Sequence, residues 1–270
     1  MTEPQATAGV APHSDNPPGG LVSETTMVVH TRTAFMLVDG RRRDDDTGKH
    51  GIIGLRQAGA ALRNILAGYR DGDPYADWML VRVHESLTEK AEYLSKLLEG
   101  GRKLMASRPG VTAEPGITRR PATITLRFNN PYGFRCAYLL QDLDTYVRTV
   151  RTLAHIGFLE RERAHRLIGE ASSAVRHAFI LTQGYRFTGV SHADFEHNTK
   201  RAREAVEKYG EIPSEILTGT VVAPFAPPRL PVFNRGMAMA QHERDTETNS
   251  DMDFKVDGEV DEPADEEVAQ

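Results

Sequence analysis

Apolar residues recur every three or four positions along several stretches of the chain, and this spacing predicts amphipathic helices. The first predicted helix begins after Gly51 and ends at the RDGDP segment. Its apolar stripe is Leu55, Ala58, Leu62, Ile65, Leu66 and Tyr69. The second follows Pro74, and its stripe repeats at close to 3.5 residues, which is typical of packing against a long helix of the same chain or of a second copy. That stripe is Leu80, Val83, Leu87, Ala91, Leu94, Leu98 and Met105, and we expect Gly100–Gly101 to interrupt it.

Two other stretches favour strands. The segment TTMVVHTRTAFMLV, Thr25 to Val38, is dense in β-branched and apolar residues and predicts one or two strands, followed by a loop at DGRRRDDDTG. In Ala122–Phe128, polar and apolar side chains alternate, so a strand here has one polar and one apolar face. The polar positions are Thr123, Thr125 and Arg127, and the apolar ones are Ile124, Leu126 and Phe128.

A helix is predicted directly after this strand. Asn130 is a good N-cap, and Pro131 suits the first helical position because its missing N–H would have no partner there. The helix should end near Gly157, and a second one should begin around Leu159. A third is expected to open at Ser191, with Asp194 three residues on as a capping partner, and to end at Gly210. The local order is therefore strand, helix, helix.

These elements divide the chain into five regions. Residues 1–20 are predicted to be a disordered tail, residues 21–106 to hold the N-terminal strands and two helices, and residues 117–220 to hold the strand and three helices, packed with the preceding segment as one compact domain. Residues 221–240 are a Pro-rich linker and residues 241–270 an acidic disordered tail. The expected fold class is mainly α with a small β component (α+β), with a ribbon-helix-helix-like unit embedded in a larger helical domain.

The net charge of -5 averages segments of opposite sign. Residues 241–270 contain twelve acidic and two basic residues, and residues 1–20 contain two acidic ones, so residues 21–240 have a net charge of about +7. A basic body with an acidic tail favours a polyanionic partner, with the tail as an intramolecular competitor. A tail that only aids solubility is the alternative.

Several classes of function lack support in the sequence. The single cysteine, Cys136, cannot form an intrachain disulfide and is expected to be a buried thiol. His192 and His197 are five apart, and there is no HExxH or CxxC motif, phosphate-binding glycine loop or nucleophile elbow. We therefore expect no metal, no cofactor and no enzyme activity. No apolar run is long enough to span a membrane, so the expected location is the cytoplasm.

The remaining candidate functional residues are a group of arginines near the alternating strand. Arg119 and Arg120 precede the alternating strand, Arg127 lies on its polar face, and Arg161, Arg163 and Arg166 lie near the start of the second helix after it. A two-stranded ribbon fits the major groove of DNA, where Arg grips guanine and Thr meets base edges. We expect Thr123, Thr125 and Arg127 to contact bases, and Arg119, Arg120, Arg161 and Arg163 to contact phosphates. One strand would come from each chain of a homodimer. The alternative is the ordinary solvent-facing side of an antiparallel strand.

Four blocks of the sequence carry a family resemblance. GIIGL (Gly51 to Leu55), DPYADWML (Asp73 to Leu80), RFNNPYGFRCAYLL (Arg127 to Leu140) and GYRFTGVSHADF (Gly184 to Phe195) together resemble the AcaB-like family of bacterial integrating conjugative elements and conjugative plasmids. The resemblance covers roughly residues 25–220. It implies a dimeric transcriptional regulator of transfer genes with a ribbon-helix-helix-type unit that binds double-stranded DNA, although many relatives carry no assigned function.

The chain departs from a minimal ribbon-helix-helix unit at two points. The helix after the strand, about 25 residues long, exceeds the usual short first helix, and Leu159 replaces the small polar residue often found after the inter-helix glycine. A rival hypothesis is a structural or adaptor protein of the transfer machinery that docks other conjugation or transcription proteins through the long helix from Pro74. The heptad-like stripe of that helix and the Pro-rich linker support it. A third, a DNA-acting enzyme, has no supporting carboxylate or histidine cluster.

Overall fold

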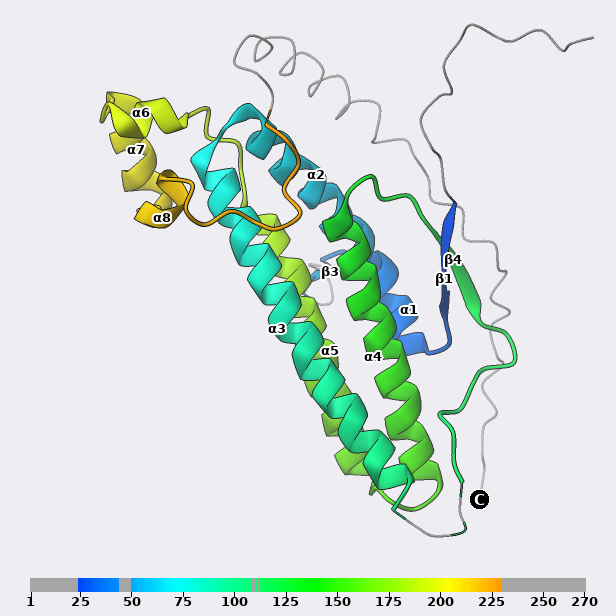
Figure 1. The fold of residues 1–270 in the computed structure, drawn as a ribbon. Coiled ribbons are helices and arrows are strands. Elements are labelled where there is room, and N and C mark those ends of the chain that lie inside the picture. The colour runs from blue at the N-terminus through cyan, green and yellow to red at the C-terminus, as the bar shows by residue number, and fades with distance from the viewer. Residues whose placement is uncertain (1–23, 44–49, 108–109, 111, 230–270) are drawn as a thin grey trace, which may run out of the picture.

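The computed structural model describes residues 24–43, 50–107, 110 and 112–229, so both predicted tails lie outside it. Within these ranges the chain forms eight α-helices and two short antiparallel sheets, which confirms a mainly helical α+β fold (Figure 1). The elements are β1 (Thr25–Val29), α1 (Arg32–Asp39), β2 (Gly40–Arg41), β3 (Ile52–Ile53), α2 (Leu55–Asp71), α3 (Pro74–Met105), β4 (Ala122–Leu126), α4 (Pro131–His155), α5 (Arg161–Leu181), a 3-10 turn (Thr182–Gly184), α6 (His192–Glu196), α7 (Lys200–Tyr209) and α8 (Ser214–Leu217). No helix in the described ranges is long and apolar enough to cross a membrane.

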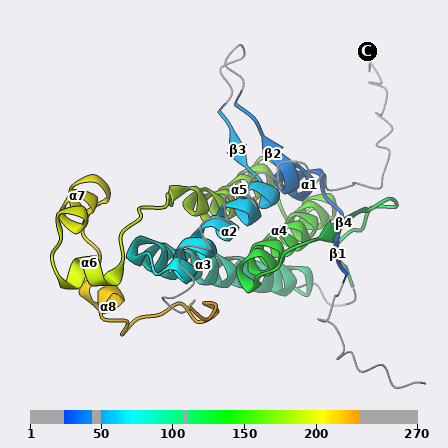
Figure 2. The ribbon, with the colours of Figure 1, turned by 90° about the horizontal axis from the view of Figure 1, so that it is seen from above.

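The long helices α3, α4 and α5 lie side by side, and α2 packs against them (Figures 1 and 2). The predicted stripe of α3 is buried apart from the half-buried Ala91, and its main partner is α4 of the same chain. The expected interruption at Gly100–Gly101 is wrong, because α3 runs unbroken to Met105. A Cβ at position 101 would lie 2.7 Å from Thr149 Cγ2 of α4, so the glycine allows the two helices to approach closely.

The N-terminal segment contains one strand followed by a helix, where one or two strands were predicted. β1 ends at Val29, and α1 begins after Thr31, whose hydroxyl accepts a hydrogen bond from Ala34 N at 3.3 Å. The β-branched residues are concentrated in β1, whereas AFML within α1 consists of residues that a helix tolerates well. Leu37 and Val38 are buried on the inner face of α1. A capped helix therefore replaces the second predicted strand.

Most other predicted helices are confirmed. α4 has Asn130 as its N-cap, with Gly133 N donating to Asn130 Oδ1 at 2.8 Å, and it ends just before Gly157, whose φ of 80° is left-handed. α5 begins at Arg161, two residues later than expected. The single helix predicted from Ser191 to Gly210 is wrong, because Asn198 has a φ of 47° and separates α6 from α7.

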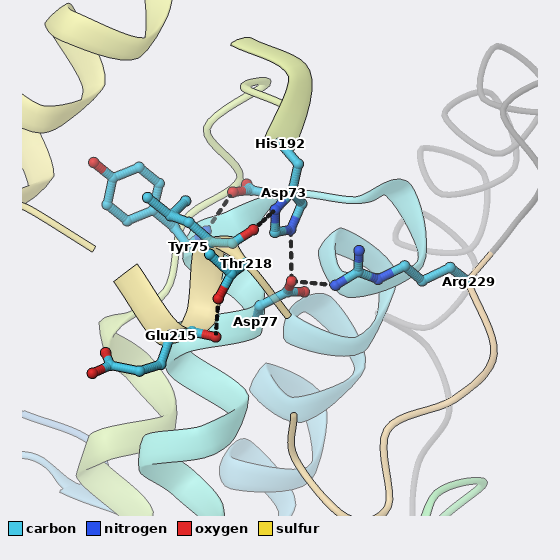
Figure 3. A network of polar contacts seen from close by, with 8 residues as sticks. Asp73, Tyr75, Asp77, His192, Glu215, Thr218 and Arg229 are labelled. Carbon is cyan, nitrogen blue, oxygen red and sulfur yellow. Dashed lines mark hydrogen bonds and ion pairs between the residues drawn. The ribbon is translucent and has the colours of Figure 1, made fainter. Parts of the chain in front are cut away.

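Two buried aspartates at the start of α3 hold the C-terminal helices against the bundle (Figure 3). Asp73 caps α3 through Tyr75 N and accepts hydrogen bonds at 2.9 Å from Tyr185 and Thr188. Burial raises the pKa of the Asp73 carboxyl, and these hydrogen bonds oppose that rise. Asp77 contacts His192 Nε2 at 2.7 Å and pairs with Arg229. The described end of the Pro-rich segment is thereby tied to α3.

Cys136 lies on α4 and is fully buried, as the sequence predicts. Burial raises the pKa of its thiol to about 12, so almost no thiolate exists at pH 8. We expect the native protein to react with a thiol reagent such as 5,5'-dithiobis(2-nitrobenzoate) at least about 100-fold more slowly than the urea-unfolded chain, because both the lost thiolate and the lost access slow the reaction. Stopped-flow absorbance at pH 8 measures both rates. Equal rates in the two states would show that Cys136 is accessible.

Candidate nucleic-acid interface

The predicted strand forms a two-stranded ribbon with a strand of its own chain. β4 pairs antiparallel with β1, and Thr26 lies opposite Thr125 while Val28 lies opposite Thr123. The expectation that a second chain provides the partner strand is wrong for this pairing. The partner is the β-branched segment at the start of the described chain, which joins β4 although some hundred residues separate them.

The two faces of the ribbon differ in polarity and burial. Met27, Val29, Ile124 and Leu126 point inward and are buried, and α4 packs against β1. The outward face consists of Thr26, Val28, Thr123 and Thr125, and Arg127 follows at the next outward position. Thr26, Thr123 and Arg127 are exposed, and Thr125 is half-buried. The polar face is therefore open within the described chain.

A buried carboxylate on α4 fixes the end of β1. Asp144 is 0% exposed, and its Oδ1 accepts a hydrogen bond from Thr31 N at 2.7 Å, while His30 N lies 3.2 Å from both carboxylate oxygens. These two amides lie between the last residue of β1 and the first of α1, where neither element supplies a partner for them. Asp144 thus sets the position of the ribbon on the bundle.

A packed aromatic ring fixes the other end of the ribbon. Phe128 follows β4, and its ring lies in edge contact with Phe134 at a centroid separation of 5.7 Å. A Cβ placed on Gly59 of α2 would lie 2.4 Å from this ring, and one placed on Gly133 of α4 would lie 2.6 Å from it. The two glycines therefore make room for Phe128 between α2 and α4. Because Arg127 directly precedes Phe128, this packing fixes the position of the Arg127 backbone.

The predicted phosphate contacts fall in two separate places. Arg119 and Arg120 are exposed and immediately precede β4. The segment before them is tied to α4, because Arg148 Nε donates to Gly116 O at 2.6 Å. Arg161 and Arg163 are exposed on the first turn of α5, at the opposite end of α4 from Arg127 (Figure 1). Arg161 lines a cavity with three other arginines, and Thr123, Thr125 and Arg127 are not among its lining residues.

Sequence reasoning missed part of this surface. Thr26 and Val28 belong to the outward face, but only the pairing of β1 with β4 reveals it. Val28 is 39% exposed, so an apolar side chain lies on this open face. Asp144 did carry a signal, because it is an acidic residue on the apolar stripe of α4, between Leu140 and Val147. A charged residue at a core position indicates a specific buried partner.

Comparisons with known proteins identify the family of the chain. No curated protein matches the chain. A similar solved structure is the crystal structure of selenomethionine-containing AcaB from uropathogenic E. coli, which is 20% identical over 73% of this chain and 95% of that chain, with a TM-score of 0.46. The family model described as transcriptional regulator AcaB matches residues 17–229. Because this match covers most of the sequence, the chain belongs to the AcaB family of transcriptional regulators.

Proposed function

We propose that this protein is a DNA-binding transcriptional regulator that reads double-stranded DNA with the outward face of the β1–β4 ribbon. The observation that carries the proposal is a two-stranded antiparallel ribbon whose polar face is open and flanked by arginines. Membership of a family of transcriptional regulators supports it.

The dimensions and chemistry of the ribbon suit the major groove. Two strands lie about 5 Å apart, and the major groove of B-DNA is about 12 Å wide, so a single ribbon enters it with its side chains toward the bases. Arg127 is placed to grip guanine, and Thr123 and Thr125 to meet base edges. Val28, which the sequence did not single out, offers an apolar contact for a thymine methyl group.

Phosphate contacts complete the proposed complex. Arg119 and Arg120 stand where the chain enters β4, so they would meet the backbone beside the groove that the ribbon enters. Arg161 and Arg163 on α5 would contact phosphates farther along the duplex. None of these four arginines has a described carboxylate partner, so each is available to a phosphate oxygen.

We further propose that the protein acts as a homodimer. A good base contact contributes about 1–3 kcal/mol of discrimination, whereas regulators prefer their sites over random DNA by about 4–10 kcal/mol. One five-residue strand pair offers few such contacts, and two copies would double them on a symmetric site. The resemblance implies transfer genes of an integrating conjugative element as the targets. Because DNA is the proposed partner, we propose the cytoplasm as the location.

The adaptor hypothesis loses one of its two supporting features, the heptad-like stripe, and keeps the Pro-rich segment. The apolar stripe of α3 packs against α4 of the same chain, so this stripe is not exposed to a helix of another protein. The long helix therefore supports the bundle that positions the ribbon.

The proposal is tested by selecting a preferred site from random duplexes and comparing two single variants on a duplex that carries one half-site of it. Arg127→Ala should weaken binding to that site by about 1–3 kcal/mol and flatten the preference at one base pair, because a base contact is lost. Arg161→Ala should weaken all duplexes alike and lower the salt dependence by about one phosphate contact. Fluorescence anisotropy at several salt concentrations measures both effects.

Comparing the affinity losses of the two variants on preferred and on random DNA distinguishes base recognition from general electrostatic attraction. If Arg127→Ala and Arg161→Ala lose affinity equally on the preferred site and on random DNA, the ribbon does not read bases. If wild-type protein selects no preferred site and its binding disappears at moderate salt, the DNA-reading function itself is refuted.

A further inference from the structure

Beside the ribbon and separate from it, a cavity with a strongly basic wall opens between α1, α4 and α5. Its volume is about 650 Å³, which lies within the range of small-molecule sites. The wall combines the β2–β3 hairpin, α1, the C-terminal end of α4 and the Arg161–Arg176 stretch of α5, which pack against one another. Figure 2 shows β2 and β3 beside α1 and α5.

The charge of the cavity wall is one-sided. Four arginines line it, and they come from three elements: Arg41 from β2, Arg151 from α4, and Arg161 and Arg176 from α5. The other polar side chains of the wall are Thr33, His165 and Ser172, and no described lining residue is an aspartate or a glutamate. Arg41 donates to His50 O at 3.0 Å, which orients its guanidinium without neutralising it. Among the described residues, Arg151, Arg161 and Arg176 have no carboxylate partner.

Such a cluster favours an anion. Like charges gathered on one wall repel each other and lower the stability of the folded chain, and a bound anion removes that cost. The guanidinium group presents paired N–H donors whose spacing matches the oxygens of a phosphate. Several arginines along one wall therefore suit a ligand that carries more than one phosphate group.

The apolar residues of the wall indicate what the part of the ligand without phosphate is like. Leu37, Ile52, Ala154 and Ile168 are aliphatic, and the described lining residues include no phenylalanine, tyrosine or tryptophan. A nucleobase would find no such ring to stack on. The wall suits a compact body of aliphatic or sugar character. We propose that this cavity binds a small organic diphosphate or bisphosphate through arginines of its wall. Arg161 is also one of the proposed DNA-phosphate contacts, whereas Arg41, Arg151 and Arg176 are not.

The test uses the full chain and inorganic pyrophosphate as the probe, with sulfate at matched ionic strength as the simple-anion control. In isothermal titration calorimetry, pyrophosphate should bind at least about tenfold more tightly than sulfate, because two groups are gripped at once. Arg176→Gln should weaken pyrophosphate about tenfold or more, since a charge-assisted contact is lost. Arg166→Gln removes the same charge from the same helix outside the cavity wall, and its affinity should stay within about twofold of wild type.

A thermal melt checks that the variants fold. Without ligand, Arg176→Gln should melt at or above the wild-type temperature, because one repelling charge is gone, and pyrophosphate should raise the midpoint of the wild type. If Arg176→Gln unfolds, Arg151→Gln on α4 provides the same test from another element.

Three outcomes would overturn the proposal. One is equal affinity for sulfate and pyrophosphate, and another is an equal loss in Arg166→Gln and Arg176→Gln. The third is a duplex that displaces pyrophosphate from the wild type and loses affinity in Arg176→Gln by the same factor. That last result would assign the cavity to the phosphates of DNA.

Discussion

Asp144→Ala is expected to lower the free energy of unfolding by about 3–4 kcal/mol, a large fraction of the stability of a typical domain. The carboxylate is 0% exposed and accepts hydrogen bonds from the amides of His30 and Thr31. Its removal leaves Thr31 N buried without a partner, and each such loss costs about 1–3 kcal/mol. Urea denaturation followed by circular dichroism measures the change.

Asp142→Ala is the matched control for this variant. Asp142 is an aspartate of the same helix, and burial alone raises the pKa of its half-buried carboxyl, so its charged form gains nothing from the fold. Its removal should cost less than about 1 kcal/mol. Hydrogen exchange adds a local reading, because the amides of β1 should exchange faster in Asp144→Ala while those of α3 keep their rates. Equal destabilisation by both variants would show that Asp144 does not hold the ribbon.

Helical periodicity revealed the bundle because each long helix buries one stripe. In α2 all six predicted stripe residues are buried. α4 begins at Pro131, as its predicted cap Asn130 requires, and α3 begins at Pro74, where a helix was expected. The failures occur where local signals compete. The β-branched residues beside α1 predict a strand there. The structure has a helix instead, because the Thr31 side chain caps it and the Thr31 amide donates to the buried Asp144.

The ribbon shows a different limit. Alternation in β4 predicted which side chains face outward, but it contains no information about which strand lies beside it. Pairing is decided by the position of β1 over α4, and that position depends on Asp144 and on the fit of Phe128 between Gly59 and Gly133. These contacts join residues that are far apart in the chain. No single-sequence pattern reports such distances.

The arginines illustrate the same point for function. Arg119, Arg120 and Arg127 are close in sequence and stay close to the ribbon, whereas Arg161 lies at the far end of α4. The fold instead groups Arg161 with Arg41 and Arg151, which the sequence places in unrelated segments. Proximity along the chain therefore predicted one basic surface, and the fold contains two.

On a duplex that carries one half-site of the selected sequence, the triple variant of Arg119, Arg120 and Arg127 to alanine is expected to lower the affinity of a single protomer about 1,000-fold at 0.1 M salt. Two lost phosphate contacts remove about 1.8 from the slope of log K against log salt, which is a factor of about 60 at this concentration. The lost base contact of Arg127 adds about 1–3 kcal/mol. Mobility shift and anisotropy measurements between 50 and 300 mM salt should show both the weaker binding and a slope reduced by about two.

A second triple variant separates this effect from a general loss of charge. Lys200, Arg201 and Arg203 are exposed on α7, which lies at the opposite end of the molecule from the ribbon (Figures 1 and 2). Replacing these three by alanine removes the same charge, and we expect an affinity within about threefold of wild type, because charges farther away than about 10 Å are largely screened. Equal losses in the two triple variants, or no loss in either, would refute a DNA contact made by the ribbon face. A loss confined to the ribbon variant, with a slope that falls by two, is the result that a groove-bound ribbon requires.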